Sequence, residues 1–426
     1  MPYEHQTSIK RPNQLVYPIL IIGVLFFIFG FVTWLNGTLI PYLKIICELE
    51  NDTQAFLVVT ASYMAYFFLA LPSASILKKI GYKKGMSVGL LVMVAGTLTF
   101  IPAADQRSFG LFLLGLFLQG AGMALLQTAS NPYISILGPM ESAAKRISIM
   151  GIANKLAGVI SPLILGSLLL ANVGNIQVQL NNNSNPEARE KLLGELASRI
   201  HFPYIIMALV LVALAIMIHK SSLPEIQEEA PVQEKKSDGQ SIFGFRHLWL
   251  GVLCIFLYVG AEVMAGDAIG IYGNSMGMPI EDTRYFTSFT LAAMLVGYII
   301  GIISIPKYVS QQQALKLSAI SGIIFTAATY FTNGYLSITM IALLGLSNAL
   351  MWPAIFPLAI SGLGSKTKTG SALLIMGIAG GAIIPLLFGE LKSIPSIEFK
   401  AAFAVLLIPS YCYILYYSLA GHKPRQ

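Results

Sequence analysis

Charged residues are scarce in this chain of 426 residues. Asp, Glu, Lys and Arg together make up 11% of the sequence, whereas hydrophobic residues make up 55%. Soluble domains carry about 25% charged residues, so too few charges are present here to cover a water-exposed surface of this size. The composition therefore excludes an ordinary soluble globular protein and favours a chain embedded in a lipid bilayer.

Cysteine is rare as well, and the sequence carries few signatures of catalysis. Cys47, Cys254 and Cys412 lie in or beside different apolar segments and form no C-x-x-C pair, so neither a disulfide framework nor a zinc site is indicated. There is no P-loop and no H-E-x-x-H. Residues 273–277 match G-x-S-x-G by letter but lack the strand–turn–helix context of a nucleophile elbow. We expect a protein that is not an enzyme and uses no metal or cofactor.

Long apolar runs dominate the rest of the chain. A hydrocarbon layer about 30 Å thick requires about 20 apolar residues per helix. The sequence contains about twelve such segments, near residues 16–43, 54–77, 85–103, 108–137, 146–171, 200–219, 247–273, 284–305, 314–332, 335–361, 369–391 and 398–419. We therefore predict an all-α integral membrane protein with twelve transmembrane helices.

Two of these segments are nearly the same in sequence. Ile149–Ala153 recurs as Ile375–Ala379, and Pro162–Gly166 recurs at nearly the same interval as Pro385–Gly389. A repeat at about half the chain length is typical of secondary transporters built from two parallel halves. Small residues and prolines of the repeat are the expected gating positions, where helices bend or pack closely: Gly158, Pro162, Gly166, Gly381, Pro385 and Gly389.

The repeat and the loops predict three regions. Residues 1–219 form an N-terminal six-helix half, residues 220–245 form a linker rich in charge and proline, and residues 246–426 form a second, pseudo-symmetric six-helix half. Most Lys and Arg residues fall on the side of both termini, which the positive-inside rule places in the cytoplasm. We expect a multi-pass protein of the inner or plasma membrane. The net charge of +7 then reflects topology and gives no reason to invoke nucleic acid.

Three charged residues lie deep within apolar runs: Lys155, Glu262 and Asp267. A charge at the bilayer centre costs about 2.5–3.5 kcal/mol, so such residues usually face a polar cavity or pair with each other. Lys155 lies near the midplane and could reach a carboxylate of segment 247–273 across the two halves. Glu262 and Asp267 are about 140° apart around a regular helix, so both can face one cavity only if the helix is irregular. A coupling role and a structural ion pair both remain open.

A second group consists of amides and one aromatic ring within the apolar segments. Amides both donate and accept hydrogen bonds and so suit sugar hydroxyls, while an aromatic plane suits the apolar face of a pyranose. The alternative is hydrogen bonding between helices, which membrane bundles use widely. With Glu262, the candidate substrate-binding residues are Asn36, Gln127, Asn131, Asn154, Asn348 and Trp352.

Four stretches resemble the fucose–galactose–glucose proton symporter family of the major facilitator superfamily. Leu125–Pro139 resembles its fourth-helix motif, Phe26–Lys44 its first helix, Tyr258–Glu262 the start of its seventh helix, and Asn348–Phe356 the tenth helix of its glucose/galactose members. The resemblance implies the major facilitator fold, alternating access and cation-coupled uptake of a hexose.

This chain departs from that family in the positions of its acidic residues within the helices. The acids that fucose transporters of the family carry in helices one and four are replaced here by Gly37 and Gln127, and Lys155 is a further departure. Asp267 lies on helix seven, the repeat counterpart of helix one. We therefore favour Asp267 as the proton carrier and Glu262 as a sugar ligand, with the reverse assignment also open.

Together these features predict a cation-coupled hexose symporter of the glucose/galactose type, with a proton favoured over sodium. Alternatives are a fucose or N-acetylglucosamine symporter, a sodium-coupled sugar transporter, a sugar or drug effluxer, and a membrane receptor with a transporter-like fold. The expected partners are a monosaccharide and the lipid bilayer, and we expect a monomer.

Overall fold

The computed structural model describes residues 12–49, 52–137, 139–170, 173–182, 185–221, 223, 241–278, 283 and 285–423, and every regular element within them is helical. The first part of the chain forms α1 (Pro12–Trp34), α2 (Asn36–Ile46), α3 (Asp52–Asp105), α4 (Phe109–Ile136), η1 (Met140–Ser142), α5 (Ala143–Leu169), α6 (Val173–Asn182), α7 (Pro186–Ser198) and α8 (His201–Lys220).

The second part begins with η2 (Ile242–Gly244). It continues with α9 (Arg246–Ser275), α11 (Phe286–Ser304), α12 (Gln311–Phe331), α13 (Gly334–Asn348), α14 (Met351–Ile360), η3 (Gly364–Lys366), α15 (Thr367–Met376), η4 (Gly377–Ala379), α16 (Gly380–Ser393), α17 (Phe399–Tyr416) and η5 (Tyr417–Gly421). Most of the predicted linker 220–245 lies outside the described residues.

Eleven runs of the described helices are long and apolar enough to cross a membrane, and the longest has 49 residues. That run lies in α3, where Gly81 interrupts the helix with φ 79° and ψ 172°. A Cβ on Gly120 of α4 would clash with the backbone of Ser62, and one on Gly122 would clash with Met93. Because residues before and after Gly81 reach the same stretch of α4, the two limbs of α3 run side by side in opposite directions. The bundle therefore has the twelve crossings that the sequence predicts.

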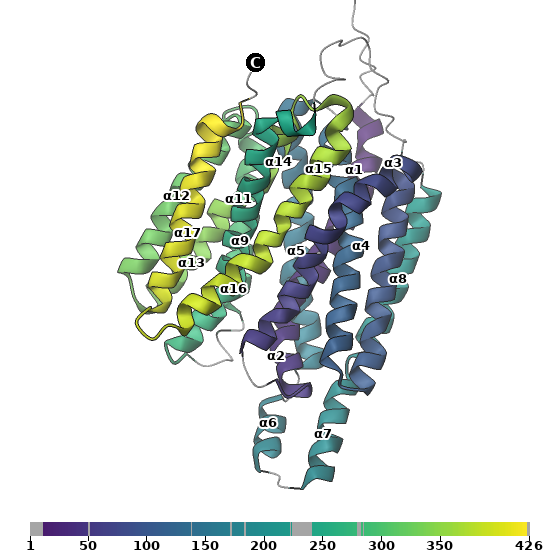
Figure 1. The fold of residues 1–426 in the computed structure, drawn as a ribbon, viewed down its shortest axis with the longest axis vertical. Coiled ribbons are helices and arrows are strands. Elements are labelled where there is room, and N and C mark those ends of the chain that lie inside the picture. The colour runs from purple at the N-terminus through teal and green to yellow at the C-terminus, as the bar shows by residue number, and fades with distance from the viewer. Residues whose placement is uncertain are drawn as a thin grey trace, which may run out of the picture.

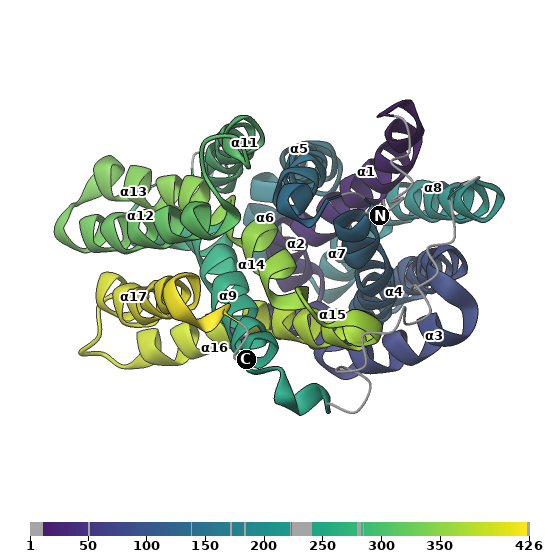
Figure 2. The ribbon, with the colours of Figure 1, turned by 90° about the horizontal axis from the view of Figure 1, so that it is seen from above.

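The helices form two groups that lie side by side (Figures 1 and 2). Helices α1–α8 lie on one side and α9–α17 on the other, while α6 and α7 project beyond the end of the bundle opposite the C-terminus. Large apolar side chains such as Phe202, Leu209 and Ile216 of α8 are exposed on the outside. This outward-facing apolar surface fits a lipid environment.

The repeat in the sequence corresponds to a repeated contact in space. Gly30 of α1 lies against the backbone of Asn154 of α5, so closely that a Cβ would clash. Gly380 of α16 lies in the same way against the backbone of Phe256 of α9. The two contacts are equivalent in the repeat. Position 256 follows position 30 by the same interval at which position 380 follows position 154. The close contact therefore occurs in both halves, but the glycine has moved to the other helix of the pair.

One turn further along, the same exchange occurs again. Gly158 of α5 faces Trp34 of α1, and Gly260 of α9 faces Ile384 of α16. These positions correspond in the repeat as well, because 260 follows 34, and 384 follows 158, by that same interval. A glycine on either helix permits a close crossing, so the two interfaces share one geometry.

Several contacts between the two halves lie at the end that carries the C-terminus. There Gln311 of α12 donates a hydrogen bond of 3.2 Å to the Glu141 carbonyl. The Lys368 ammonium lies 5.1 Å from the ring centroid of Tyr82. Near the opposite end, α2, α6 and α7 pack chiefly on helices of their own half. The halves are therefore joined at the end with the C-terminus.

Candidate functional site

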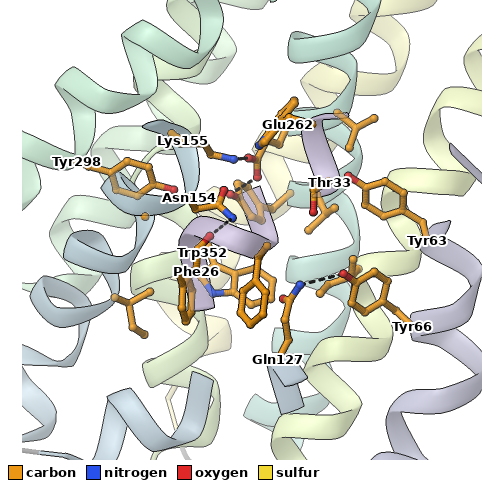
Figure 3. A pocket seen from close by; sticks show the side chains of 18 residues that line it. Phe26, Thr33, Tyr63, Tyr66, Gln127, Asn154, Lys155, Glu262, Tyr298 and Trp352 are labelled. Carbon is orange, nitrogen blue, oxygen red and sulfur yellow. Dashed lines mark hydrogen bonds and ion pairs between the residues drawn. The ribbon is translucent and has the colours of Figure 1, made fainter. Parts of the chain in front are cut away.

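A cavity of about 110 Å³ lies between the two halves (Figure 3). Its walls come from α1, α3, α4 and α5 on one side and from α9, α11, α14 and η4 on the other. A ligand in this cavity contacts both halves at once. That position is typical of the binding site of an alternating-access transporter.

The charged residues of the cavity wall, Lys155 and Glu262, form an ion pair between the halves. The Lys155 ammonium donates to one carboxylate oxygen of Glu262, and the Tyr258 hydroxyl donates to the other. The two charged side chains are only 7% and 12% exposed. The Lys155 ammonium also lies 4.4 Å from the ring centroid of Trp34, within the range of a cation–π interaction. The expectation that Lys155 reaches a carboxylate of this helix is confirmed.

Asp267 lies on the same helix but outside the cavity wall. Helix α9 is continuous from Arg246 to Ser275, so Glu262 and Asp267 point in different directions from it. Within the described part of the chain, no hydrogen bond or ion pair holds the Asp267 carboxylate. Its charge still interacts with those of Glu262 and Lys155 through space.

Two of the predicted amides line the cavity. Gln127 of α4 donates a hydrogen bond of 2.9 Å to the Tyr66 hydroxyl. Asn154 of α5 donates one of 3.2 Å to the carbonyl of Phe26 in α1. Each amide keeps its side-chain oxygen as an acceptor for a ligand, and both lie on the same side of the cavity as α1 (Figure 3).

The remaining predicted ligands lie in different surroundings. Trp352 lines the cavity, and its indole N–H donates a bond of 3.3 Å to Asn131, which is itself buried behind the wall. Asn348 is also fully buried and accepts a hydrogen bond of 2.9 Å from Tyr411. It therefore lies away from the cavity. Asn36 begins α2, and its side chain lies outside the described set.

Several residues of the wall carry no signal in the sequence. The cavity is also lined by Trp34, Tyr63, Tyr66 and Tyr298, which the sequence does not single out because aromatic residues in an apolar run are usually core residues. Tyr258 could have been found, since it precedes Glu262 by four residues and so shares its helix face. Sequence reasoning identified the charges of the site and missed most of its hydroxyl groups.

The predicted gating residues differ in their packing. A Cβ on Gly158 would lie 2.5 Å from Trp34, and one on Gly381 would lie 2.7 Å from Tyr63 of the other half. Gly389 has open space at that position, so it does not mediate a close crossing. Pro385 is buried within α16; Pro162 and Gly166 lie within α5. Their part in gating stays a prediction.

Comparison with known proteins gives a consistent result. The family model described as Major Facilitator Superfamily matches residues 22–418. A glucose/galactose transporter of Brucella abortus biovar 1 (strain 9-941) is 36% identical over 403 residues, covering 94% of this chain and 93% of the relative. The L-fucose-proton symporter of Escherichia coli (strain K12) is 27% identical over 425 residues, covering 97% of this chain and 95% of the relative.

Solved structures show the same fold. A crystal structure of the E. coli fucose:proton symporter is 25% identical, with a TM-score of 0.80 over 95% of this chain and 98% of that one. A crystal structure of a major facilitator transporter in the outward conformation is 26% identical, with a TM-score of 0.81 over the same shares. The prediction of twelve helices in two pseudo-symmetric halves is confirmed.

Proposed function

Because the chain belongs to the major facilitator superfamily, we propose that it is a proton-coupled hexose symporter of the glucose/galactose type that works by alternating access. The observation that carries the proposal is the cavity between the halves, with its amides, hydroxyls and aromatic rings. A relative that is 36% identical is named a glucose/galactose transporter, which supports the choice of sugar.

The chemistry of the wall favours a neutral sugar. Lys155 and Glu262 neutralise each other, so the wall offers no unpaired charge to an anionic or cationic substrate. Gln127, Asn154 and the tyrosine hydroxyls can exchange hydrogen bonds with sugar hydroxyls. Trp352 presents an aromatic plane for the apolar face of a pyranose ring.

A proton is the coupling ion that we favour. The E. coli relative is named an L-fucose-proton symporter, and this chain has two carboxylates on α9 where a proton can bind. Asp267 is the carboxylate without a partner among the described residues, so it is free to gain and lose a proton. Glu262 is the sugar ligand in this proposal, because it lines the cavity and an ionised carboxylate can accept further hydrogen bonds.

The proposal includes topology and organisation. The end of the bundle with the C-terminus is cytoplasmic, and so are both termini, as the distribution of basic residues indicates. Residues 1–219 and 246–426 are the two moving halves, and 220–245 is the cytoplasmic linker between them. One chain carries a complete cavity, so the working unit is a monomer in the inner or plasma membrane.

Transport in proteoliposomes tests the proposal. The purified protein is reconstituted, and uptake of radiolabelled glucose or galactose is measured with an inward proton gradient, an inward sodium gradient or neither. We expect accumulation above equilibrium with the proton gradient alone. Counterflow without any gradient measures exchange separately and serves as the control for active protein.

Each alternative has its own outcome in this assay. Accumulation of fucose or N-acetylglucosamine in place of glucose and galactose would change the assigned sugar. Accumulation driven by sodium alone would replace the proton, and export under the same gradient would indicate an effluxer. Binding without exchange would indicate a receptor and overturn the transport function.

A further inference from the structure

The two carboxylates of α9 differ in their hydrogen-bond and ion-pair partners. Glu262 accepts a hydrogen bond from the Lys155 ammonium on one oxygen and one from the Tyr258 hydroxyl on the other, and its side chain is 12% exposed. Asp267, five residues further on, has no hydrogen bond or ion pair with any described residue. A structural reason for this difference is Lys155, which approaches from α5 of the other half.

The contacts of Glu262 favour an ionised carboxylate. An ionised carboxylate offers only acceptors, and it accepts the hydrogen bonds of Lys155 and Tyr258 on separate oxygens. If Glu262 took a proton, the Lys155 ammonium would lose its counter-charge while it remains 7% exposed. A buried charge without a partner is strongly unfavourable, so the pair holds Glu262 in its ionised form.

The groups around Glu262 provide no other cation within the described part of the chain. Phenol groups interact with it from α3 (Tyr63), α11 (Tyr298) and α17 (Tyr411), and Asp267 adds a negative charge from α9. All of these groups are neutral or negative. Lys155 is therefore the counter-charge on which the ionised state of Glu262 depends.

Trp34 keeps that counter-charge in place. Its ring lies on the ammonium of Lys155, and it is itself packed against Gly158 of α5 and Gly266 of α9. An aromatic face attracts a cation without accepting its proton. Lys155 is thus held at the boundary between the halves by groups that leave its charge unchanged.

We propose that Lys155 sets the number of protons that accompany each sugar. By keeping Glu262 ionised, it leaves Asp267 as the one carboxylate that takes a proton from the outer solution and releases it to the cytoplasm. Lys155 is a positioning residue here, because it acts through Glu262. This inference rests on the proposed proton-coupled transport.

The first test is the proton-to-sugar stoichiometry, measured from the reversal potential in proteoliposomes. The parent protein carries one proton per sugar. In Lys155→Met, the unpaired Glu262 also takes a proton from the outer solution and releases it to the cytoplasm in each cycle, so a second proton accompanies each sugar. The double variant Lys155→Met/Glu262→Gln returns to one proton, and the conservative variant Lys155→Arg keeps the parent value.

The second test does not depend on transport. Infrared difference spectra of the purified protein, recorded over a pH titration, report the carbonyl stretch of each carboxyl that becomes protonated. We expect one band in the parent that Asp267→Asn removes, and an additional band in Lys155→Met that Glu262→Gln removes. Circular dichroism and gel filtration confirm folding, and Lys155→Gln replaces Lys155→Met if the latter misfolds.

The outcomes separate this inference from the proposed function. A parent protein that accumulates no sugar under a proton gradient contradicts the proposed function. A parent that does accumulate sugar, together with a Lys155 variant that shows neither a second proton nor an additional band, overturns the role of Lys155.

Discussion

At the scale of single residues, the cavity wall depends on hydrogen bonds that a ligand can exchange. Gln127 is held by the Tyr66 hydroxyl from α3, and Asn154 by the Phe26 carbonyl from α1. In both cases the amide N–H is used within the protein, and the amide oxygen remains for the ligand. The orientation of each amide is thereby fixed without a ligand.

The first prediction concerns these amides. Loss of a hydrogen-bond partner from a buried polar ligand costs about 1–3 kcal/mol. Gln127→Ala should therefore weaken sugar binding by roughly 5- to 150-fold, since about 1.4 kcal/mol corresponds to one decade. Isothermal titration calorimetry on the purified protein measures the change. Tyr66→Phe is the comparison variant, because it keeps Gln127 and removes the hydroxyl that accepts the hydrogen bond of Gln127. If Gln127→Ala and Asn154→Ala both bind as the parent does, the sugar site lies elsewhere.

The second prediction concerns coupling. Asp267→Asn preserves size and removes titration, so the variant should lose accumulation under a proton gradient and keep counterflow of labelled for unlabelled sugar. Glu262→Gln provides the comparison, since it removes an acceptor in the cavity and should weaken sugar binding. Accumulation at the parent level in both variants would favour sodium, coordinated by amides and carbonyls.

How much of the site is predictable from sequence depends on the chemistry of each residue. Lys155 and Glu262 stand out because a charge in an apolar run is costly and needs a partner. Tyr63 and Tyr298 do not stand out, because a tyrosine can bury its ring in any core. Asn348 looked like a ligand, yet it is bonded to Tyr411, and only the tertiary structure shows which neighbour an amide takes.

At the scale of helices, the crossing of α1 with α5 positions the charged end of the site. Gly158 gives Trp34 its space, and Trp34 in turn lies against the Lys155 ammonium. The corresponding crossing of α9 with α16 uses Gly260 against Ile384. Because these two pairs are tightly packed, we expect each pair to move as one body in the proposed rocking of the halves.

The third prediction follows from this packing. A valine at Gly158 would displace Trp34, whose nearest atom lies 2.5 Å from the position of the new Cβ. Gly158→Val should therefore slow counterflow more than it weakens sugar binding. Gly389→Val is the matched control, because its Cβ would meet no atom within 4 Å. Equal transport rates in the two variants would remove close packing as the cause, and slowing in both would point to helix bending.

The helices themselves were predictable because apolar length alone defines them. The hairpin within α3 was predictable as well, since the basic residues around Gly81 separate the apolar segments 54–77 and 85–103. The repeated contacts could not be predicted. Their glycines exchange helices between the halves, so an alignment of the repeats pairs Gly30 with Phe256 and hides the common geometry.

At the scale of the whole molecule, some of the contacts between the halves lie at the end with the C-terminus. A buried apolar cluster there consists of Ala144 of α5, Ile305 directly after α11, and Ala314 of α12. Alternating access requires these contacts to separate in each cycle. A covalent bond across this cluster should therefore hold the molecule in the conformation described.

The fourth prediction uses that cluster. After the native cysteines are replaced, the double variant Ala144→Cys/Ala314→Cys is oxidised. Transport should stop while sugar binding from the opposite end persists, and reduction should restore transport. Each single cysteine variant is the control. Transport at the parent rate after complete cross-linking would show that this end does not open.

The native thiols bear on the same experiment. Burial raises the pKa of the Cys47 thiol to about 12, so it remains protonated at neutral pH. The thiolate is the reactive form, so Cys47 should react slowly with maleimide and rapidly only as the pH approaches that value. Cys254 is buried, and Cys412 is exposed within the membrane-spanning stretch Phe399–Gly421, where lipid is expected to keep it from the aqueous reagent. Background labelling of the native protein should therefore be slow.

The ion pair between the halves also has a consequence during biosynthesis. Lys155 and Glu262 are separated by 107 residues. At a ribosomal rate of about 5–20 residues per second, Lys155 leaves the ribosome roughly 5–20 seconds before its partner exists. During that interval the nascent first half carries an uncompensated ammonium within an apolar helix, which the insertion machinery must retain next to water or protein. The second half thus completes the insertion of the first, and a fragment that ends before α9 should be a substrate for membrane quality control.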